Sequence, residues 1–356
     1  MPPSHANDAR YTSSVIDPTA FWTRISMTTN QKEFSRVNLN EDMPEVLKNA
    51  VVAIGNFDGV HRGHLAVLDL AKDIANSEMR PAVVMTFEPH PRDYFSPDQS
   101  VFRLTPSAMK ANLFDLIGLD GNVIVSFDKQ LANTSADEFV SRILVEQLNV
   151  GHVVTGYNFH FGKARKGTPA FLQEAGNKFG FGVTTVSSFD DEGGKPVSSS
   201  RIRTALEQGK VVEAAGLLGY RWNVTGKVCE GKKLGRTLGF PTANLVLPDN
   251  MQLTNGIYAV RVKRESGAIH DGVASFGRRP TFDNGAELLE SFLFDFDDDL
   301  YGETISVSLF GYLRGEEKFA SADALIEQMK KDETEARALL SGVKPLSALD
   351  GVLNFG

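Results

Sequence analysis

The sequence predicts an α/β domain followed by an all-β domain, and three observations carry this prediction. Up to about residue 220, short continuous apolar runs alternate with helical patterns, which is typical of βαβ units and a parallel sheet. Beyond it, short β-like segments follow one another without helices between them, as in an antiparallel sheet or small barrel. A length of 356 residues also allows two domains. We expect domains over residues 46–220 and 221–356, after a loosely held, flexible extension over residues 1–45.

The first domain opens on apolar segments that predict buried strands. Residues 50–54 form a continuous apolar run that ends at Gly55, and residues 82–87 form a second run that ends before Pro89. Shorter runs at 123–125 and 152–154 repeat the pattern, and helical patterns lie at about 64–76 and 135–147. Strands and helices that alternate in this way predict a doubly wound sheet with its functional site at the carboxyl ends of the strands.

The second domain is divided by Gly, Asp and Asn into short segments with β character. These segments lie at residues 223–225, 256–262, 272–276, 291–296 and 305–310. One long helix then begins near Ser321, a residue type that favours N-caps, and repeats apolar residues over 325–340. We therefore expect a small antiparallel barrel with one long helix packed against it.

Composition and charge narrow the function classes. The 37 Lys and Arg residues against 45 Asp and Glu residues give a formal net charge of −8, which argues against a non-specific nucleic-acid binder. Cys229 is the only cysteine, so we expect no internal disulfide, no cysteine-based zinc site and a reducing compartment. No apolar stretch approaches a membrane span, and the N-terminal part lacks the apolar core of a secretory signal. We expect a cytoplasmic protein without nucleic-acid or membrane partners; an amphipathic arm is the less favoured interpretation of residues 1–45.

The sharpest feature is the run Gly55-Asn56-Phe57-Asp58-Gly59-Val60-His61-Arg62-Gly63-His64. It joins a predicted strand to a predicted helix, so backbone N–H groups and the positive helix end face the edge of the sheet. Because His61 and His64 are three residues apart, a helical turn places both on one side, and Gly63 lets a ligand approach the backbone. Two surface histidines in a glycine-rich turn are the alternative, but this placement favours hydrogen bonds to phosphate oxygens.

This run resembles the HxGH signature of the nucleotidyltransferase superfamily, and the longer string resembles the adenylyltransferase module of prokaryotic bifunctional riboflavin kinase/FAD synthetases. Further blocks of that module are matched in the same order at residues 87–91 (FEPHP), 103–105 (RLT), 156–162 (GYNFHFG) and 197–203 (VSSSRIR). The resemblance implies that His61 and His64 are catalytic and that Asn158 and Phe159 bind the flavin. It implies these ATP-binding residues: Gly55, Asn56, Phe57, Asp58, Gly63, Ser198, Ser199, Ser200, Arg201 and Arg203.

The chemistry of adenylyl transfer gives a physical reason for these residue types. The α-phosphorus becomes pentacovalent and gains negative charge, and donors aimed at that charge are usually the largest catalytic contribution. His61, His64 and the turn at 198–203 can supply such donors, and Arg201 and Arg203 can neutralise the departing pyrophosphate. Taken alone, the serine–arginine run is equally well a capped surface helix, and the basic residues at 163–166 are a solvated loop.

The second half nearly matches a phosphate-binding P-loop at residues 226–233. We reject that interpretation, because Lys233 stands where Ser or Thr would bind Mg²⁺ and the segment is not part of a βαβ unit. Residues 234–244 (LGRTLGFPTAN) resemble the nucleotide loop of riboflavin kinases, with a surface loop as the alternative. The resemblance implies Mg²⁺ binding by Thr242 and Asn244, whose oxygens suit this ion. It implies these ATP-binding residues: Gly231, Lys232, Gly235, Arg236, Gly239, Thr242 and Asn244.

Glu290 aligns with the catalytic base of the riboflavin kinases. A carboxylate beside the ribityl 5′-hydroxyl can take its proton during phosphoryl transfer. Without the flanking match, Glu290 would be interpreted as a solvated charge at a strand start. The chain also departs from the family, which often has Asn at the position of Ser275, His at that of Phe292 and Asp at that of Asn158. These departures leave open how the flavin is held at both sites.

The resemblance covers about residues 48–340 and implies a bifunctional enzyme of flavin cofactor synthesis. Riboflavin would be phosphorylated with MgATP to FMN, and AMP would then be transferred from ATP to FMN, giving FAD and pyrophosphate. One alternative is a single-activity FMN adenylyltransferase with an inactive kinase domain; another is a flavin-binding protein on an inactive nucleotidyltransferase scaffold. The expected partners are ATP, riboflavin and FMN, and a monomer and a weak homo-oligomer both remain open.

Overall fold

Six parallel strands form the first sheet, in the spatial order β1-β4-β3-β2-β5-β6. The computed structural model describes residues 33–356 except residues 97, 99, 231–239, 249 and 279–286. The strands are β1 (Ser35–Asn38), β2 (Val51–Ile54), β3 (Ala82–Glu88), β4 (Gly121–Ser126), β5 (His152–Gly156) and β6 (Gly182–Val186). The helices of this half are α2 (Arg62–Glu78), α3 (Pro91–Phe95), α4 (Ser107–Leu116), α5 (Lys129–Asn133), α6 (Ala136–Glu138), α7 (Pro169–Phe179), α8 (Ser199–Glu207) and α9 (Val211–Leu218), with 3₁₀ turns at Glu45–Leu47 and Lys163–Arg165.

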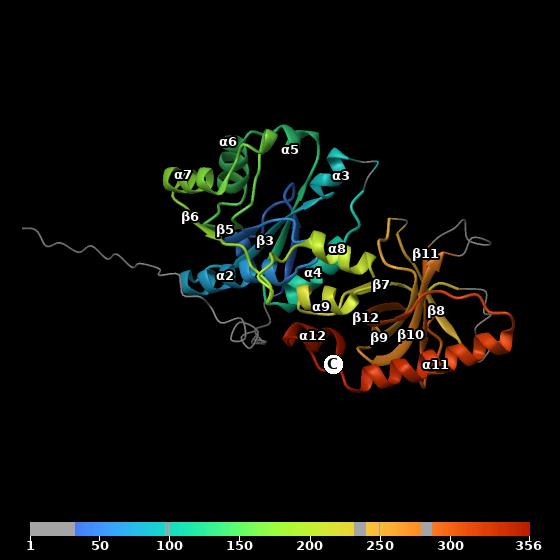
Figure 1. The fold of residues 1–356 in the computed structure, drawn as a ribbon. Coiled ribbons are helices and arrows are strands. Elements are labelled where there is room, and N and C mark those ends of the chain that lie inside the picture. The colour runs from blue at the N-terminus through green and yellow to red at the C-terminus, as the bar shows by residue number, and fades with distance from the viewer. Residues whose placement is uncertain (1–32, 97, 99, 231–239, 249, 279–286) are drawn as a thin grey trace, which may run out of the picture.

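Helices cover both faces of this sheet, which confirms the doubly wound α/β prediction (Figure 1). Alternate residues of β2 point to opposite faces. Val51 and Ala53 belong to a core with α2 and α4, whereas Val52 and Ile54 belong to a second core with α7 and the helix at Phe139–Gln147. Burial on both faces is the reason that these strands are continuous apolar runs.

Two parts of this half differ from the prediction. Residues 35–38, expected within a loose extension, form the edge strand β1, which pairs with β4 from Ser35↔Gly121 to Asn38↔Ile124. The helix expected at about 135–147 begins at α6, whose N-cap Ser135 and Glu138 form a capping box, and continues as a π-helix over Phe139–Gln147. The wider π winding is recognised from its backbone geometry, not from apolar spacing.

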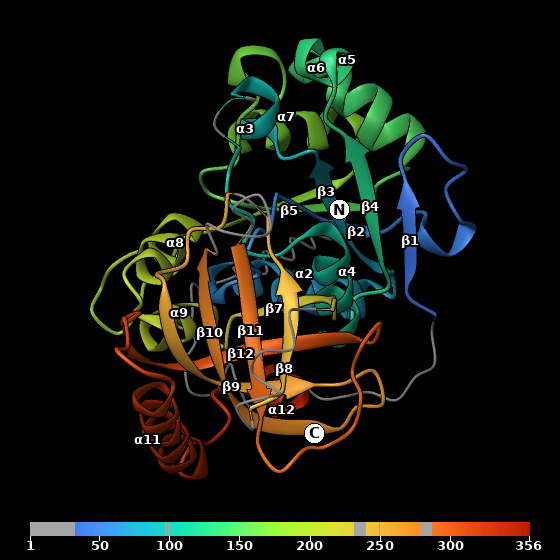
Figure 2. The ribbon, with the colours of Figure 1, turned by 90° about the vertical axis from the view of Figure 1, so that its right-hand side faces the viewer.

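An antiparallel barrel forms the second half, as predicted. Its six strands lie in the order β7-β12-β9-β10-β11-β8, and an isolated bridge between Cys229 and Asn244 brings β7 and β8 together so that the barrel is nearly closed (Figure 2). The strands are β7 (Asn223–Lys227), β8 (Thr242–Val246), β9 (Gly256–Lys263), β10 (Ile269–Arg278), β11 (Glu287–Leu293) and β12 (Thr304–Arg314). Helix α11 (Ala322–Ser341) begins at the predicted N-cap Ser321 and packs Ala336 and Leu340 on the outside of the barrel.

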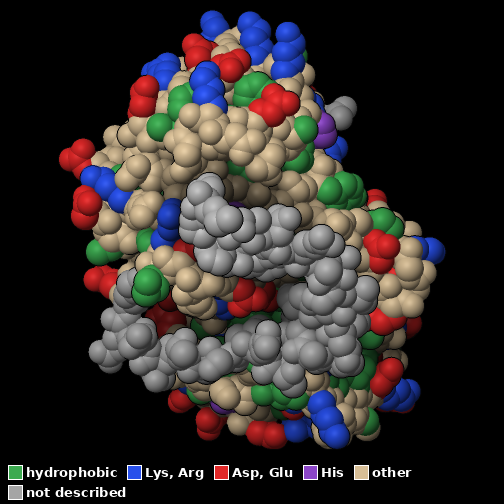
Figure 3. Space-filling view, turned by 90° about the vertical axis from the view of Figure 1, so that its left-hand side faces the viewer, with side chains coloured by type: hydrophobic (Ala, Val, Ile, Leu, Met, Phe, Trp, Pro, Cys, Tyr) green, Lys and Arg blue, Asp and Glu red, His purple; other side chains and the backbone are tan. Residues whose placement is uncertain are grey.

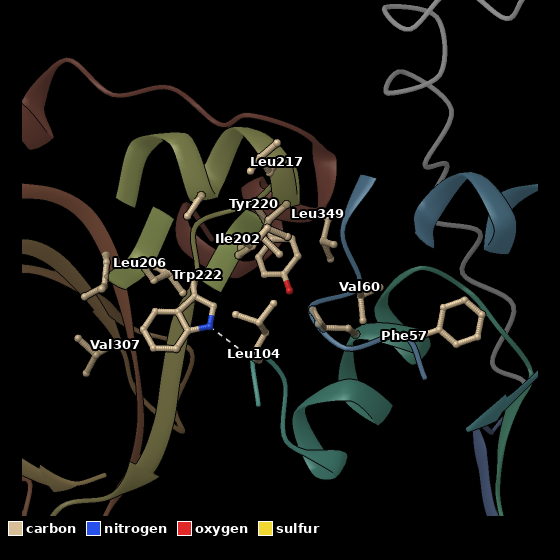
Figure 4. Close-up of a cluster of buried hydrophobic side chains, with 14 of the residues drawn as sticks. Phe57, Val60, Leu104, Ile202, Leu206, Leu217, Tyr220, Trp222, Val307 and Leu349 are labelled. Atoms are coloured by element: carbon tan, nitrogen blue, oxygen red, sulfur yellow. Dashed lines mark hydrogen bonds between the residues drawn. The ribbon is translucent and has the colours of Figure 1, made fainter. Parts of the chain in front are cut away.

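The two halves share one apolar core at their junction. Helices α8 and α9 lie between the sheet and the barrel, and the short helix α12 (Ala348–Asn354), which the sequence did not predict, lies beside them (Figure 1). Figure 4 shows Tyr220 and Trp222 at the centre of this core, among side chains from both halves. Between them, Arg221 forms a buried ion pair with Asp350 of α12, which also accepts a hydrogen bond of 2.9 Å from the Arg221 backbone N–H.

The surface mixes charges of both signs. Figure 3 shows Lys and Arg side chains interspersed with Asp and Glu on the face that it presents. Within the described residues, no helix has both the length and the apolar character that a membrane crossing requires.

We expect Asp350→Ala to lower the free energy of unfolding by about 3–5 kcal/mol, because it leaves the Arg221 guanidinium buried without its partner. Chemical unfolding monitored by fluorescence measures this. The matched control is Glu327→Ala, which breaks the exposed pair with Lys331 and should change stability little. Equal losses in the two variants would contradict the importance assigned to the junction pair.

Candidate active site

The turn between β2 and α2 brings the two predicted histidines together. His61 is the N-cap of α2, and its Nδ1 accepts a hydrogen bond of 3.2 Å from the His64 backbone N–H. The two imidazole rings stack with their centroids 3.6 Å apart and an interplanar angle of 14°. Both rings therefore lie on one side of the turn, at the carboxyl end of β2.

Burial keeps this histidine pair neutral. Burial lowers the pKa of His61 to about 4, and burial together with His61 and Lys110 lowers the pKa of His64 well below its ordinary value. Because His61 Nδ1 accepts a hydrogen bond, the neutral ring carries its proton on Nε2. His61 thus offers an N–H donor without a positive charge of its own.

Two buried polar atoms beside the turn are left for a ligand. Within the described residues, His64 Nδ1 and Asn56 Oδ1 have no hydrogen-bond partner. Buried polar atoms of native proteins are nearly always paired, so atoms of this kind mark a place where a bound polar molecule belongs. Space is also tight at Gly63, where a Cβ would lie 3.3 Å from the His61 ring. The absent side chain therefore makes room for the imidazole as well as for a ligand.

Asp58, predicted to bind ATP, is bound by donors of the protein that hold the turn in shape. Its buried carboxylate accepts hydrogen bonds from the Thr105 backbone N–H at 3.0 Å and from the Leu104 backbone N–H at 3.3 Å. It also forms an ion pair with Arg203 of α8. A carboxylate so fully occupied by protein donors has little capacity left for a nucleotide.

The serine–arginine run forms the start of α8 and meets the histidine turn. Ser198 is the N-cap, and Ser199 Oγ donates to the Asp58 carbonyl at 2.7 Å. Arg203 donates to the Phe102 carbonyl at 2.7 Å in addition to its pair with Asp58. Arg201 is held by Asp191 at 2.7 Å, and Ser200 is exposed. The structure therefore brings Ser199 and Arg203 to the turn, whereas Arg201 and Ser200 point to other surroundings.

An ionic cluster that the sequence analysis did not assign to the site lies beneath the turn. Lys110 of α4 is 1% exposed, and its Nζ donates to the Asn56 carbonyl at 3.1 Å and to Glu88 at 2.9 Å. Arg103 reaches the same Glu88 oxygen at 2.9 Å. A signal for Lys110 exists in the sequence, because it shares a helical face with the apolar residues Leu113 and Phe114. A charged side chain on the apolar face of a helix is buried on folding, so it indicates that an oppositely charged side chain lies nearby in the core.

The predicted flavin-binding residues follow β5 on the same edge of the sheet. β5 pairs with β2 up to Ile54↔Thr155, so the segment after Gly156 is adjacent to the histidine turn. Asn158 is exposed, and the half-buried Phe159 stacks on Phe161 with ring centroids 5.6 Å apart. The basic residues at 163–166 are exposed beyond them. An accessible aromatic and a polar side chain therefore stand beside the turn.

A second set of predicted residues shares the outer face of the barrel. The register pairs Glu290 of β11 with Asn244 of β8 on one side and with Ser275 of β10 on the other. Residues directly opposite each other have Cβ atoms about 5 Å apart and side chains on the same face. The next pair on this face is Phe292 with Thr242. Glu290 lies in the middle of β11, which corrects its expected place at a strand start, and β11 begins at Glu287, not at 291.

The donor set on this face fits a hard cation. Asn244 is 4% exposed, and its Oδ1 has no hydrogen-bond partner among the described residues. An amide oxygen and the Thr242 hydroxyl are suitable Mg²⁺ ligands when nucleotide phosphates complete the coordination. Five predicted ATP-binding residues of this half lie outside the described residues: Gly231, Lys232, Gly235, Arg236 and Gly239.

Two family models match the two halves of the chain. A model described as FAD synthetase matches residues 43–201, and a model described as riboflavin kinase matches residues 218–340. The bifunctional riboflavin kinase/FMN adenylyltransferase of Escherichia coli K12 is 39% identical over 298 residues, which cover 84% of this chain and 95% of the relative. The Pseudomonas fluorescens protein of the same description is 40% identical over 293 residues, 82% of this chain and 93% of its own.

Solved structures include one with the same arrangement of both halves. The crystal structure of a macrolide-efflux protein from Streptococcus pneumoniae matches with a TM-score of 0.76 and 33% sequence identity. The match covers 85% of this chain and 98% of that one. The likeness therefore extends over both halves of the fold.

We expect the free energy of unfolding to fall as the pH is lowered from about 6.5 towards 4. Burial lowers the pKa of His61 and of His90 to about 4, so between these values the unfolded chain binds protons that the folded chain does not. Each imidazole contributes a slope of roughly 1 kcal/mol per pH unit in this window. Urea unfolding at several pH values measures it. His90→Gln should make the dependence shallower, and a dependence parallel to that of the wild type would contradict the assignment.

Proposed function

The chain belongs to the family of bifunctional riboflavin kinase/FMN adenylyltransferases, and on that premise we propose how its residues divide the two reactions. The chain is a transferase that phosphorylates riboflavin to FMN and transfers AMP from ATP to FMN, which gives FAD and pyrophosphate. The division is supported by one observation: the histidine turn belongs to the parallel sheet, whereas Glu290 and Asn244 belong to the barrel. We assign adenylyl transfer to residues 46–220 and kinase activity to residues 221–356. We place the enzyme in the cytoplasm.

In the first domain, the histidine pair would stabilise charge on the α-phosphate of ATP. An oxygen of the FMN phosphate forms a bond to the α-phosphorus, and the bond to the bridging oxygen breaks as pyrophosphate leaves with its electron pair. His61 Nε2–H and His64 donate hydrogen bonds to the equatorial oxygens, whose charge grows in the transition state. Lys110 and Arg103 add positive potential, and Asp58 and Arg203 hold the turn against α8. Asn158 and Phe159 would hold the flavin of FMN beside the turn.

In the second domain, Glu290 would take the proton of the ribityl 5′-hydroxyl while the oxygen attacks the γ-phosphorus of ATP. The carboxylate is half-buried beside Asn244, so the hydroxyl would lie between the base and the phosphate ligands. Mg²⁺ held by Thr242 and Asn244 Oδ1 would neutralise charge on the transferring phosphate. Ser275 and Phe292 flank Glu290 and Thr242, so they would contact the flavin side of the substrate.

A single-activity adenylyltransferase would require a kinase face that has lost its machinery. The presence of Thr242, Asn244 and Glu290 on one face speaks against it. Chromatography of the products from riboflavin and MgATP separates the two functions: FMN appears first and FAD follows if both sites act. Conversion of added FMN to FAD without any FMN from riboflavin would support the single-activity alternative.

Two substitutions should separate the reactions. Glu290→Gln removes the base, so FMN formation should be lost by about 100-fold or more, while FMN is still converted to FAD. His64→Ala should do the reverse, because it removes a donor to the α-phosphate. Product chromatography measures both, and His152→Ala, at the opposite end of β5 from the proposed flavin-binding segment, is the control for His64. A folded variant that lost both activities would contradict two separate sites.

Asn244→Ala should raise the Mg²⁺ concentration at which FMN formation is half-maximal, because it removes one of two proposed ligands. Initial rates over a Mg²⁺ titration measure this. The Mg²⁺ dependence of FMN adenylation in the same variant is the control and should match that of the wild type. A kinase titration curve that does not move would remove Asn244 from the metal site.

A further inference from the structure

The histidine turn has an unusual backbone that needs support. Phe57, Gly59 and Val60 all have positive φ, at +48°, +90° and +38°. Glycine adopts such angles freely, but a β-branched residue such as Val60 does so only under strain, since its Cβ then crowds the backbone. Conformations of this kind persist only where surrounding contacts determine them. Val60 directly precedes His61, so its backbone sets the direction from which α2 and both imidazoles start.

Two hydrogen bonds act directly on the strained peptide. Its N–H, on Val60, donates to the Phe57 carbonyl at 3.1 Å within the turn, and its carbonyl is bound from outside the turn. The Tyr220 hydroxyl donates a hydrogen bond of 2.7 Å to the carbonyl of Gly59. That carbonyl belongs to the peptide unit between Gly59 and Val60, whose orientation is set by Gly59 ψ and Val60 φ. A rotation of this peptide towards an ordinary φ at Val60 would turn the carbonyl away from Tyr220. The hydrogen bond therefore opposes the relaxation that the strain favours.

Burial makes this contact obligatory. Tyr220 is 0% exposed, so water cannot replace the hydrogen bond if either partner moves. Figure 4 shows the Tyr220 ring entering the shared core with its hydroxyl directed towards the turn that carries Val60. Burial also raises the pKa of Tyr220, so the hydroxyl keeps its proton and remains a donor.

The tyrosine is itself fixed from the barrel side. The next residue, Arg221, is bound to Asp350, donates to the Lys344 carbonyl at 3.0 Å and stacks over Phe310 with 4.7 Å to the ring centroid. Two residues on, Trp222 Nε1 donates to the Leu104 carbonyl at 2.9 Å. Leu104 is one of the residues whose backbone binds Asp58. The segment 220–222 thus supports the histidine turn while the barrel and α12 anchor it.

We propose that Tyr220 is a positioning residue of the adenylyl-transfer site, which holds the Gly59–Val60 peptide so that His61 and His64 face the α-phosphate. The proposal rests on the function proposed for the histidine pair. Because Arg221 and α12 anchor the segment that follows Tyr220, the barrel side of the chain supports the first domain's site.

The test is Tyr220→Phe in the full chain, with both reactions measured in the same preparation. We expect kcat for FMN adenylation to fall about tenfold, while KM for FMN changes less than about threefold, because the histidines are misdirected and the flavin contacts stay. FMN formation from riboflavin should stay within about twofold of the wild type. Tyr258→Phe is the matched control: it removes another buried tyrosine hydroxyl bound to a backbone carbonyl, inside the barrel, and should leave adenylation unchanged.

The same substitution in a Val60→Gly chain separates a positioning role of Tyr220 from a general loss of stability. Glycine carries no penalty at positive φ, so Tyr220→Phe should reduce kcat much less in a Val60→Gly chain than in the wild type. The same fold-loss in both backgrounds would overturn the proposal, and so would adenylation by Tyr220→Phe at the wild-type rate or a parallel fall in both reactions. A wild-type chain that does not adenylate FMN would overturn the proposed function itself, whereas these outcomes overturn the role of Tyr220 alone.

Discussion

One buried carboxylate, that of Asp58, holds together the segments that form the proposed adenylyl-transfer site, because it must be supplied with hydrogen-bond donors. Asp58 is 3% exposed, and a charge at that depth is tolerated only when it is fully paired. Its donors come from two separate parts of the chain: the backbone at Leu104 and Thr105, and the side chain of Arg203. Satisfying this one group therefore draws the loop after α3 and the helix α8 onto the histidine turn. The relative positions of the histidine turn and α8 in the proposed nucleotide site therefore follow from the hydrogen bonding of Asp58.

Sequence patterns predicted many elements of the fold, although not β1 or α12, and they did not predict the order or register of the strands. The apolar runs at β2 and β3 are local signals, because burial on both faces removes the polar residues that would otherwise alternate. The strand order and the pairing of β8 with β11 depend on contacts between distant segments. For that reason the row formed by Ser275, Glu290 and Asn244 was visible only in the structure, and so was the correct position of Glu290 within its strand.

Predictions about the active site likewise depended on whether a feature is local in the sequence or depends on contacts between distant residues. That His61 and His64 lie together could be predicted, because their spacing and the preceding strand are local features. The ion pair between Asp58 and Arg203 could not be predicted, because the sequence does not show whether a charge faces a ligand or another side chain. Lys110 carried a readable signal, a cation on an apolar helical face. Tyr220 carried none, since a bond from a side chain to a distant carbonyl leaves no periodic trace.

The shared core at the junction also couples the stability of the two halves, and therefore the two reactions. Because side chains of both halves pack into one cluster, unfolding of one half would expose apolar surface of the other. A destabilising substitution in the barrel then lowers the folded population of the adenylyl-transfer site as well. A destabilising substitution in either half would therefore reduce the formation of both FMN and FAD, even where it lies in the domain of only one site.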